Sequence, residues 1–169
     1  MTQDTHSSAH YDALESHTAQ QRAERLLGQL AQTVAHAQAE SGAFAEILKG
    51  VDARSVTTLE ALAQLPVTRK SELLARQQAH RSTDAFGGFS TLAYGKDMPH
   101  VFASPGTIYE PEGTATDYWR TARAVYAAGF RPGELIHNCF SYHFTPAGSM
   151  MDCAARAIGC TVFPGGIGQ

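Results

Sequence analysis

The stretch VFASPGTIYEPEG, Val101 to Gly113, decides how the second half of the chain is interpreted. The apolar run at residues 100–104 predicts a β-strand, and the Pro, Gly and Thr that follow predict a loop. A helix is expected from residue 114, because Thr114 and Asp117 have the spacing of a capping box. A loop between a strand and a helix N-terminus is a common place for phosphate binding. This loop, however, carries two acids and no lysine.

Toward the C-terminus, expected strands and helices alternate. After a helix at 114–128, the expected elements are a strand at 135–140, a helix at 147–158 and a strand at 160–163. Gly129 and Gly159 stand where left-handed residues end helices. The order β-α-β-α-β predicts parallel strands joined by crossover helices. Ligands of such sheets lie at the carboxyl ends of the strands, where three segments should converge, namely residues 104–112, 141–147 and 164–169.

Toward the N-terminus, the sequence predicts helices. Residues 11–80 form an expected helical region, with helices at 11–39, 43–48, 57–65 and 69–78. Thr57 and Glu60 have capping-box spacing, and Pro66 is a stop signal. Residues 81–99, rich in Gly, Ser and Thr, predict a connecting loop or small hairpin, and residues 1–10 are expected to be disordered. The predicted fold class is therefore α/β, with N-terminal helices followed by a parallel unit at 100–169 in a single domain.

Composition excludes several classes of function. The 169-residue chain has a formal charge of -3, which gives no basic surface for nucleic acid or anionic membrane. It contains no apolar run long enough to span a bilayer and no signal-peptide pattern, so a cytoplasmic protein is expected. The three cysteines, Cys139, Cys153 and Cys160, are an odd number in apolar surroundings and are expected to be buried, reduced thiols.

Several segments together resemble the phenylacetate-CoA ligase family of adenylate-forming enzymes. LAQLPVTRKSEL (62–73) is similar to the family's Leu-Pro, Thr and Lys run, and AAGFRPGELIHNCF (127–140) to its Ala-Ala-Gly-x-Arg-Pro-Gly-Asp turn. FTPAG (144–148) resembles its Phe-Thr-Gly-Gly segment, and IGCTVFPGGIGQ (158–169) its Gly-Cys-Thr-Val-Ile-Pro segment. The resemblance runs from about Leu26 to the last residue. It implies the large domain of an AMP-binding ligase.

The resemblance implies an acid–thiol ligase that uses ATP, Mg and coenzyme A. Such an enzyme converts an aryl or acyl carboxylate to an adenylate and then to a CoA thioester. Ser104, Gly106 and Thr107 match the family's nucleotide loop and are the implied cofactor-binding residues. The implied substrate-pocket residues lie after the second and third strands: Tyr142, His143, Phe144, Gly165 and Gly166. No residue of this chain is assigned a catalytic role.

Three residues of the loop depart from the family's pattern. Pro105 has no N–H to offer a phosphate, and Tyr109 stands where the family has a glycine. Glu110 stands where the family has a lysine, so the sign of the charge is reversed. The sequence therefore predicts weak triphosphate binding. An ordinary strand-to-helix loop is the alternative interpretation of Ser104 to Thr107, and Glu110 with Glu112 are expected to be acids at a helix entry.

Two further alternatives concern metal and assembly. His137, Cys139 and His143 offer zinc-type ligands, but His143 lies past the strand and a fourth ligand is not evident, so no metal site is expected. The family's later segments have no counterpart here, so the chain is expected to be a truncated N-terminal portion that is inactive alone. A C-terminal half or separate ligase chain is an expected partner, and exposed apolar edges predict a possible homodimer. The competing hypothesis is a non-catalytic binding or assembly module.

Overall fold

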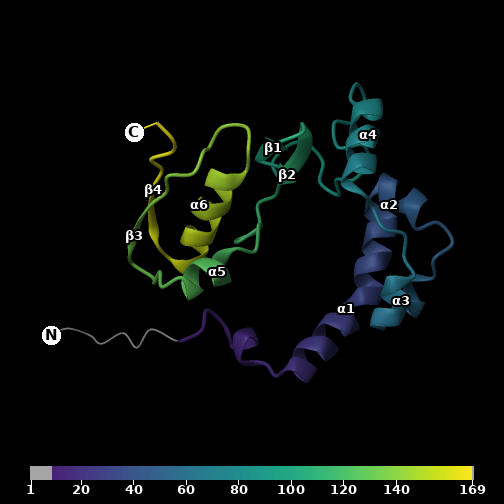
Figure 1. Ribbon diagram of the computed structural model, residues 1–169, viewed down its shortest axis with the longest axis horizontal. Coiled ribbons are helices and arrows are strands. Elements are labelled where there is room, and N and C mark those ends of the chain that lie inside the picture. Colours follow the sequence, from purple (N-terminus) through teal and green to yellow (C-terminus); the bar gives the residue numbers. More distant parts are fainter. Residues whose placement is uncertain (1–8, 169) are drawn as a thin grey trace. The chain divides into compact units, whose positions relative to one another are not determined.

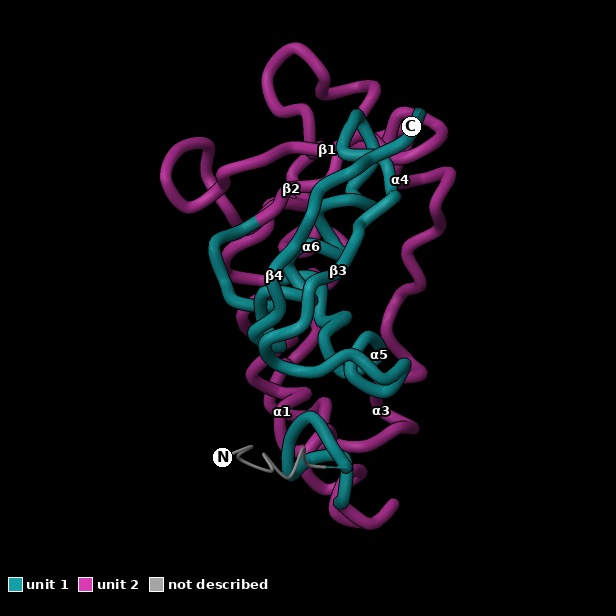
Figure 2. Tube along the Cα trace, turned by 90° about the vertical axis from the view of Figure 1, so that its left-hand side faces the viewer, with its two compact units in different colours: residues 1–16, 113–169 teal, residues 17–112 magenta. Residues whose placement is uncertain are grey.

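The computed structural model describes residues 9–168, which form two compact units (Figures 1 and 2). Within the described residues, unit 1 comprises residues 9–16 and 113–168, and unit 2 comprises residues 17–112. The elements of unit 2 are α1 (Ala19–Glu40), α2 (Gly42–Ile47), η2 (Ala53–Ser55), α3 (Leu59–Ala63), α4 (Lys70–His80), β1 (His100–Ser104) and β2 (Ile108–Glu112). Those of unit 1 are η1 (Ala13–Ser16), α5 (Ala122–Ala127), β3 (Leu135–His137), α6 (Ala147–Ile158) and β4 (Thr161–Phe163). The disorder expected at residues 1–10 falls mostly on residues 1–8, outside the described residues.

Helix α1 begins at a capping box at Thr18, so it starts later than the helix expected at 11–39. The Thr18 hydroxyl accepts the N–H of Gln21 at 3.2 Å, and the Gln21 side chain accepts the N–H of Thr18 at 2.9 Å. At the other end, Ser41 follows α1 and caps α2, because its hydroxyl accepts the N–H of Phe44. The same hydroxyl donates to the carbonyl of Gly88 at 2.7 Å. One buried serine thus joins two helices to the loop after α4.

The core of unit 2 lies where α1 packs against the segment after α2. Its buried residues are Val34, Leu48, Ala53 and Val56. Gln38 donates from its side-chain nitrogen to the carbonyls of Leu48 and Val51, both at 3.0 Å. The predicted capping box at Thr57 is wrong by one residue, because the Thr58 hydroxyl accepts the N–H of Ala61 and begins α3. Cap position depends on local backbone conformation as well as spacing.

Strands β1 and β2 form an antiparallel hairpin, which corrects the predicted β-α-β-α-β order. The register pairs His100 with Glu112 and Ser104 with Ile108, and a tight turn at Ser104–Thr107 joins the strands. The first expected strand therefore pairs with its own continuation and not with the parallel strands. Glu110 and Glu112 consequently lie on a strand and do not enter a helix. A Pro-Gly turn reverses the chain after a short strand, which is the physical cause.

Unit 1 retains a single β-α-β crossover: β3 and β4 pair in parallel, with α6 between them in sequence. Gly129 and Gly159 have positive φ angles of 111° and 96°, so both helix-ending glycines are confirmed. The helix expected at 114–128 is reduced to Ala122–Ala127. It begins where the Asp117 carboxylate accepts the N–H groups of Thr121 and Ala122. The predicted box at Thr114 is therefore wrong.

The core of unit 1 lies between α5, α6 and one face of the β3–β4 pair. Its buried residues are Ala122, Tyr126, Ile136, Ala154, Ala155, Ile158 and Cys160. Tyr11 packs against it, with its ring 5.8 Å from that of Tyr126. The expectation of three buried thiols is wrong, because Cys139 is exposed and Cys153 only half-buried. Among the described helices, none has the length and apolar character to cross a membrane.

Candidate functional site

The turn between β1 and β2 holds the three residues predicted to bind a nucleotide. Ser104 ends β1, and its carbonyl accepts the N–H of Thr107 at 3.0 Å. Gly106 and Thr107 have φ angles of 102° and 60°, in the left-handed region. Pro105, Gly106 and Thr107 are exposed, and the Ser104 hydroxyl donates to the carbonyl of Ile108 at 3.4 Å. The chain therefore reverses here over four residues.

This turn offers few hydrogen-bond donors to a triphosphate. A phosphate-cradling loop presents several free N–H groups and hydroxyls to one oxygen cluster. Here Pro105 has no N–H, while the N–H of Thr107 and the hydroxyl of Ser104 are engaged within the turn. Glu110 adds a carboxylate on the adjoining strand, where a phosphate would be repelled. Gly106 leaves open space beside its Cα, so the turn is accessible but poor in donors.

Strand β2 is held against α4 by a buried glutamine that no sequence motif marks. Gln77 is 3% exposed, and its side chain pairs with both backbone groups of Tyr109. The side-chain nitrogen donates to the Tyr109 carbonyl at 3.0 Å, and the Tyr109 N–H donates to the Gln77 oxygen at 2.8 Å. Arg81 lies 5.4 Å from the centre of the Tyr109 ring and donates to its hydroxyl. Tyr109 thus holds the β1–β2 hairpin against α4.

The acids of β2 differ in their surroundings. Glu112 is 7% exposed, and its carboxylate lies 2.7 Å from Nδ1 of His100 on the paired strand. Glu110 is half-buried and lies two residues earlier on β2. Residues two apart in a strand point to the same face, which places Ile108, Glu110 and Glu112 together. Glu112 therefore links the two strands, while Glu110 remains available to other groups.

In unit 1, a buried asparagine organises the loops that follow β3 and β4. Asn138 is 3% exposed; its side-chain nitrogen donates to the Gly148 carbonyl at 2.8 Å and to the Tyr142 hydroxyl at 2.6 Å. Its side-chain oxygen accepts the N–H of Phe140 at 3.1 Å. Its backbone carbonyl accepts the N–H of Gly166 at 2.9 Å. One side chain therefore sets the loop after β3, and its backbone holds the loop after β4.

The structure brings together three of the five predicted pocket residues around Asn138. Tyr142 and Gly166 bond to it directly. At Gly165 an added Cβ would come within 2.2 Å of Nε2 of His137, so a side chain there would require the exposed imidazole to move. Burial, followed by the negative charge of Asp152, raises the pKa of the Tyr142 hydroxyl. These groups form a rigid, polar junction at the carboxyl ends of the parallel strands.

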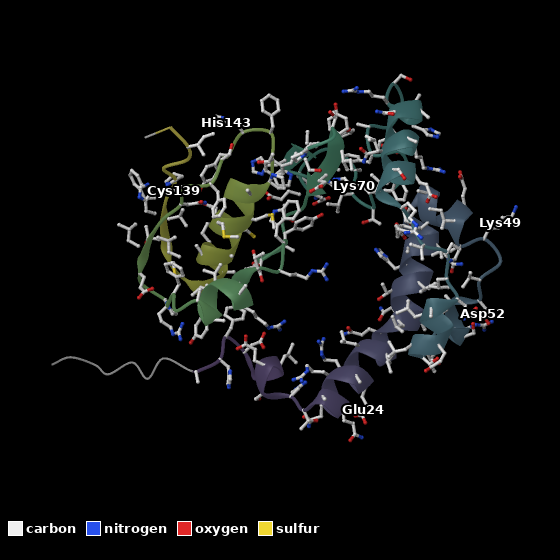
Figure 3. All side chains as sticks on the ribbon, in the orientation of Figure 1. Glu24, Lys49, Asp52, Lys70, Cys139 and His143 are labelled. Carbon is white, nitrogen blue, oxygen red and sulfur yellow. The ribbon has the colours of Figure 1, made fainter. Side chains whose placement is uncertain are left out.

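The other two predicted pocket residues, His143 and Phe144, lie on the exposed part of the loop after β3. Figure 3 shows His143 and Cys139 on this loop. The Phe144 side chain is 83% exposed, and its φ angle of 58° is unusual for an aromatic residue. Ser141 stabilises the bend, because its hydroxyl accepts the N–H of His143 at 3.1 Å. Their pocket role stays a prediction.

The predicted residues are divided between the two units. Ser104, Gly106 and Thr107 belong to unit 2, and the five residues from Tyr142 to Gly166 belong to unit 1. Within residues 9–168, no group of three or more His, Cys, Asp or Glu side chains is placed to hold a metal ion. Sequence reasoning missed Asn138 and Gln77. The available signal for Asn138 was a polar amide inside the apolar run Leu135–Phe140.

Three curated relatives match this chain, and all are named phenylacetate-coenzyme A ligase. That of Thermus thermophilus is 32% identical over 68% of this chain, that of Aromatoleum evansii 31% over 72%, and that of Pseudomonas putida 30% over 98%. The matched parts are 25%, 27% and 36% of those proteins, so the chain spans about a quarter to a third of its relatives' length. No protein-family model matches the chain.

Solved structures of 2-hydroxyisobutyryl-CoA ligase share the fold. The complex with 2-HIB-AMP and CoA in the thioesterification state aligns with a TM-score of 0.78 at 19% identity, over 96% of this chain and 35% of that one. The postadenylation complex with 2-HIB-AMP aligns with a TM-score of 0.76 at 21% identity, over 89% of this chain and 32% of that one. At this identity the likeness concerns the fold alone.

Proposed function

We propose that this chain, which belongs to the phenylacetate-CoA ligase family, supplies the N-terminal portion of a carboxylate–CoA ligase and is inactive without the remaining portion. The proposal rests on the difference between the share of this chain that is matched and the share of the relative that is matched. The Pseudomonas putida relative matches 98% of this chain, but the match is only 36% of that relative. A complete ligase would activate an aryl or acyl carboxylate with ATP and transfer the acyl group to coenzyme A.

Unit 1 supports a role in holding the carboxylate substrate. The Asn138 junction fixes the loops that carry Tyr142, Phe144, Gly165 and Gly166, and a fixed loop is what substrate positioning requires. In this proposal the aromatic rings border the apolar part of the acid, and the two glycines allow its close approach. His143 stands at the exposed rim of the same loop.

The nucleotide is proposed to be held mainly by groups outside this chain. Ser104, Gly106 and Thr107 border it in the family's manner, but the turn offers too few free donors for a triphosphate. The same shortage leaves no basis for placing Mg here. Coenzyme A and ATP therefore enter the proposal as ligands of the completed enzyme, and no step of the reaction is assigned to residues of this chain.

The remaining portion of the ligase is proposed to dock on the bare face of the β3–β4 pair. Helix α6 covers the Ile136 side, and strand alternation puts Leu135 and Phe163 on the other side, where they are 69% and 57% exposed. Parallel strands are normally covered on both faces. A complementary polypeptide, or a second copy of this chain, would bury these side chains.

The test is split-enzyme complementation. The chain is mixed with the part of the Pseudomonas putida relative that it does not match, and phenylacetate-dependent exchange of pyrophosphate into ATP is measured. Exchange is expected with the mixture and not with either component. Leu135→Glu should abolish it, whereas Leu59→Glu, at a residue of unit 2 that is 65% exposed, should not. Exchange by the chain alone would contradict the proposed dependence.

The second candidate function is a non-catalytic binding or assembly module. The donor-poor turn and the carboxylate of Glu110 favour it. The same experiment distinguishes the two functions. A non-catalytic module would bind the complementary polypeptide, as detected by light scattering, but would not restore pyrophosphate exchange. If neither binding nor exchange occurs and the chain elutes as a monomer, both functions are refuted.

A further inference from the structure

A half-open cavity of about 220 Å³ lies within unit 2, between α4, the loop that follows it and β2. Its walls are mostly apolar side chains, chiefly Leu73, Phe86, Phe89 and Ile108. Pockets for drug-sized ligands usually measure about 300–1,000 Å³, so this one suits a single ring or a short chain. Its lining includes Tyr109 and Glu110, which depart from the family's nucleotide loop, but none of the residues predicted to bind nucleotide or substrate.

The walls of the cavity are held by hydrogen bonds, so it does not depend on a ligand for its shape. Gln77 fixes β2 to α4 through both backbone groups of Tyr109. Asp84 accepts the N–H groups of Phe86 and Gly88 at 2.8 and 2.6 Å, which orders the loop that carries both phenylalanines. Phe89 also packs edge-on against Phe44 at 5.5 Å. A preformed cavity lowers the entropic cost of binding.

Among the polar groups that line the cavity, the carboxylate of Glu110 can bind a ligand. The Gln77 amide is occupied by Tyr109, and the Ser90 hydroxyl both donates to the carbonyl and accepts the N–H of Leu92. Within the described part of the chain, no hydrogen bond or ion pair engages the carboxylate of Glu110. Its charge is therefore the only formal charge among the lining residues.

We propose that this cavity binds a small organic ammonium, in which an aromatic ring or short alkyl chain carries one positive amine. The apolar body would pack against Leu73, Phe86 and Ile108, and the amine would donate to Glu110. Aromatic faces attract cations as well. The cavity excludes anions for the same reason, because a carboxylate or phosphate would meet the Glu110 charge in partly apolar surroundings.

The experiment compares three probes of similar size on the whole chain: 2-phenylethylamine, 2-phenylethanol and phenylacetate. Binding is followed by amide chemical shifts in two-dimensional NMR, with titration to several millimolar. The amine is expected to shift the amides of α4 and β2 and to saturate, while phenylacetate leaves them unchanged. Glu110→Gln should weaken binding of the amine by about tenfold or more, since it removes a charge-assisted hydrogen bond.

Two variants serve as controls for this experiment. Glu40→Gln makes the same charge change at an exposed position outside the cavity and should leave the affinity within twofold. Leu73→Trp fills the cavity from α4 and should block binding of the amine. The dispersion of its amide chemical shifts shows whether this variant is folded. Equal binding of amine and phenylacetate, or an unchanged affinity in Glu110→Gln, would overturn the proposal. So would an absence of saturable shifts in the folded wild-type chain.

Discussion

Replacing Asn138 by alanine tests whether one buried amide holds the loops of unit 1. The substitution removes three hydrogen bonds, those to Gly148, Tyr142 and Phe140. The backbone bonds of residue 138 to Phe163 and Gly166 are unaffected, because they involve only its N–H and carbonyl. The variant therefore isolates the contribution of the side chain.

The expected loss follows from the burial of the partners. A hydrogen bond contributes about 1 kcal/mol net, and a buried group left without its partner costs about 1–3 kcal/mol. Gly148 is buried, so its carbonyl loses a partner that water cannot readily replace, whereas Phe140 is exposed. The free energy of unfolding of unit 1 is expected to fall by about 2–4 kcal/mol. Tyr142→Phe, which removes a half-buried hydroxyl, is expected to cost about 1 kcal/mol.

The assay is urea unfolding followed by tryptophan fluorescence. Trp119 is the only tryptophan of the chain and lies in unit 1, so its emission reports that unit. The two single variants and the double variant form a cycle, and the coupling energy measures the bond between Asn138 and Tyr142. A loss below about 1 kcal/mol in Asn138→Ala, within the usual range for surface substitutions plus error, would refute the central role given to this amide.

Three further predictions follow from other contacts. Gly88→Ala should lower the free energy of unfolding by more than about 1 kcal/mol, because φ is +83° and the added Cβ would lie 2.9 Å from the first turn of α2; urea unfolding measures it. Cys139 should react with a thiol reagent within minutes, and Cys160 only upon unfolding, because Cys160 is buried and burial raises its pKa; mass spectrometry of the labelled protein decides. The hydrogen bond from Arg123 lowers the pKa of Asp12, so the stability it adds is present above pH 3.8 and is lost as pH falls through the lowered pKa. The difference in Tm between wild type and Asp12→Asn should accordingly disappear toward pH 2, and a difference that persists there would contradict the ion-pair explanation.

The features that the sequence predicted well are those set by local chemistry. The helices expected at 11–39, 43–48 and 69–78 correspond to α1, α2 and α4, and the ends of α5 and α6 follow from glycines that adopt positive φ. The β3–α6–β4 crossover follows from two short apolar runs around an amphipathic helix. These signals lie within a few residues of the structure they determine.

The features that were missed depend on pairing between distant or competing segments. Strand His100–Ser104 had two possible partners, and the Pro105–Gly106 dipeptide is a turn signal that favours a hairpin. The resemblance to a nucleotide loop outweighed that signal. Gln77 and Asn138 were missed because a buried amide has no period or motif. Its role appears only when the backbone groups that it satisfies are known.

The contact between Gly165 and His137 limits how this sequence can diverge. Any side chain at position 165 would meet the imidazole, so a replacement there requires the exposed His137 side chain either to change rotamer or to be shortened. The order of the two changes matters, because enlarging residue 165 first displaces the imidazole from its edge-on contact with the Phe163 ring, whereas shortening residue 137 first makes room without that displacement. Descendants of this chain should therefore show position 165 enlarged more often where position 137 is small, a historical dependence that reconstructed ancestors of the lineage would record.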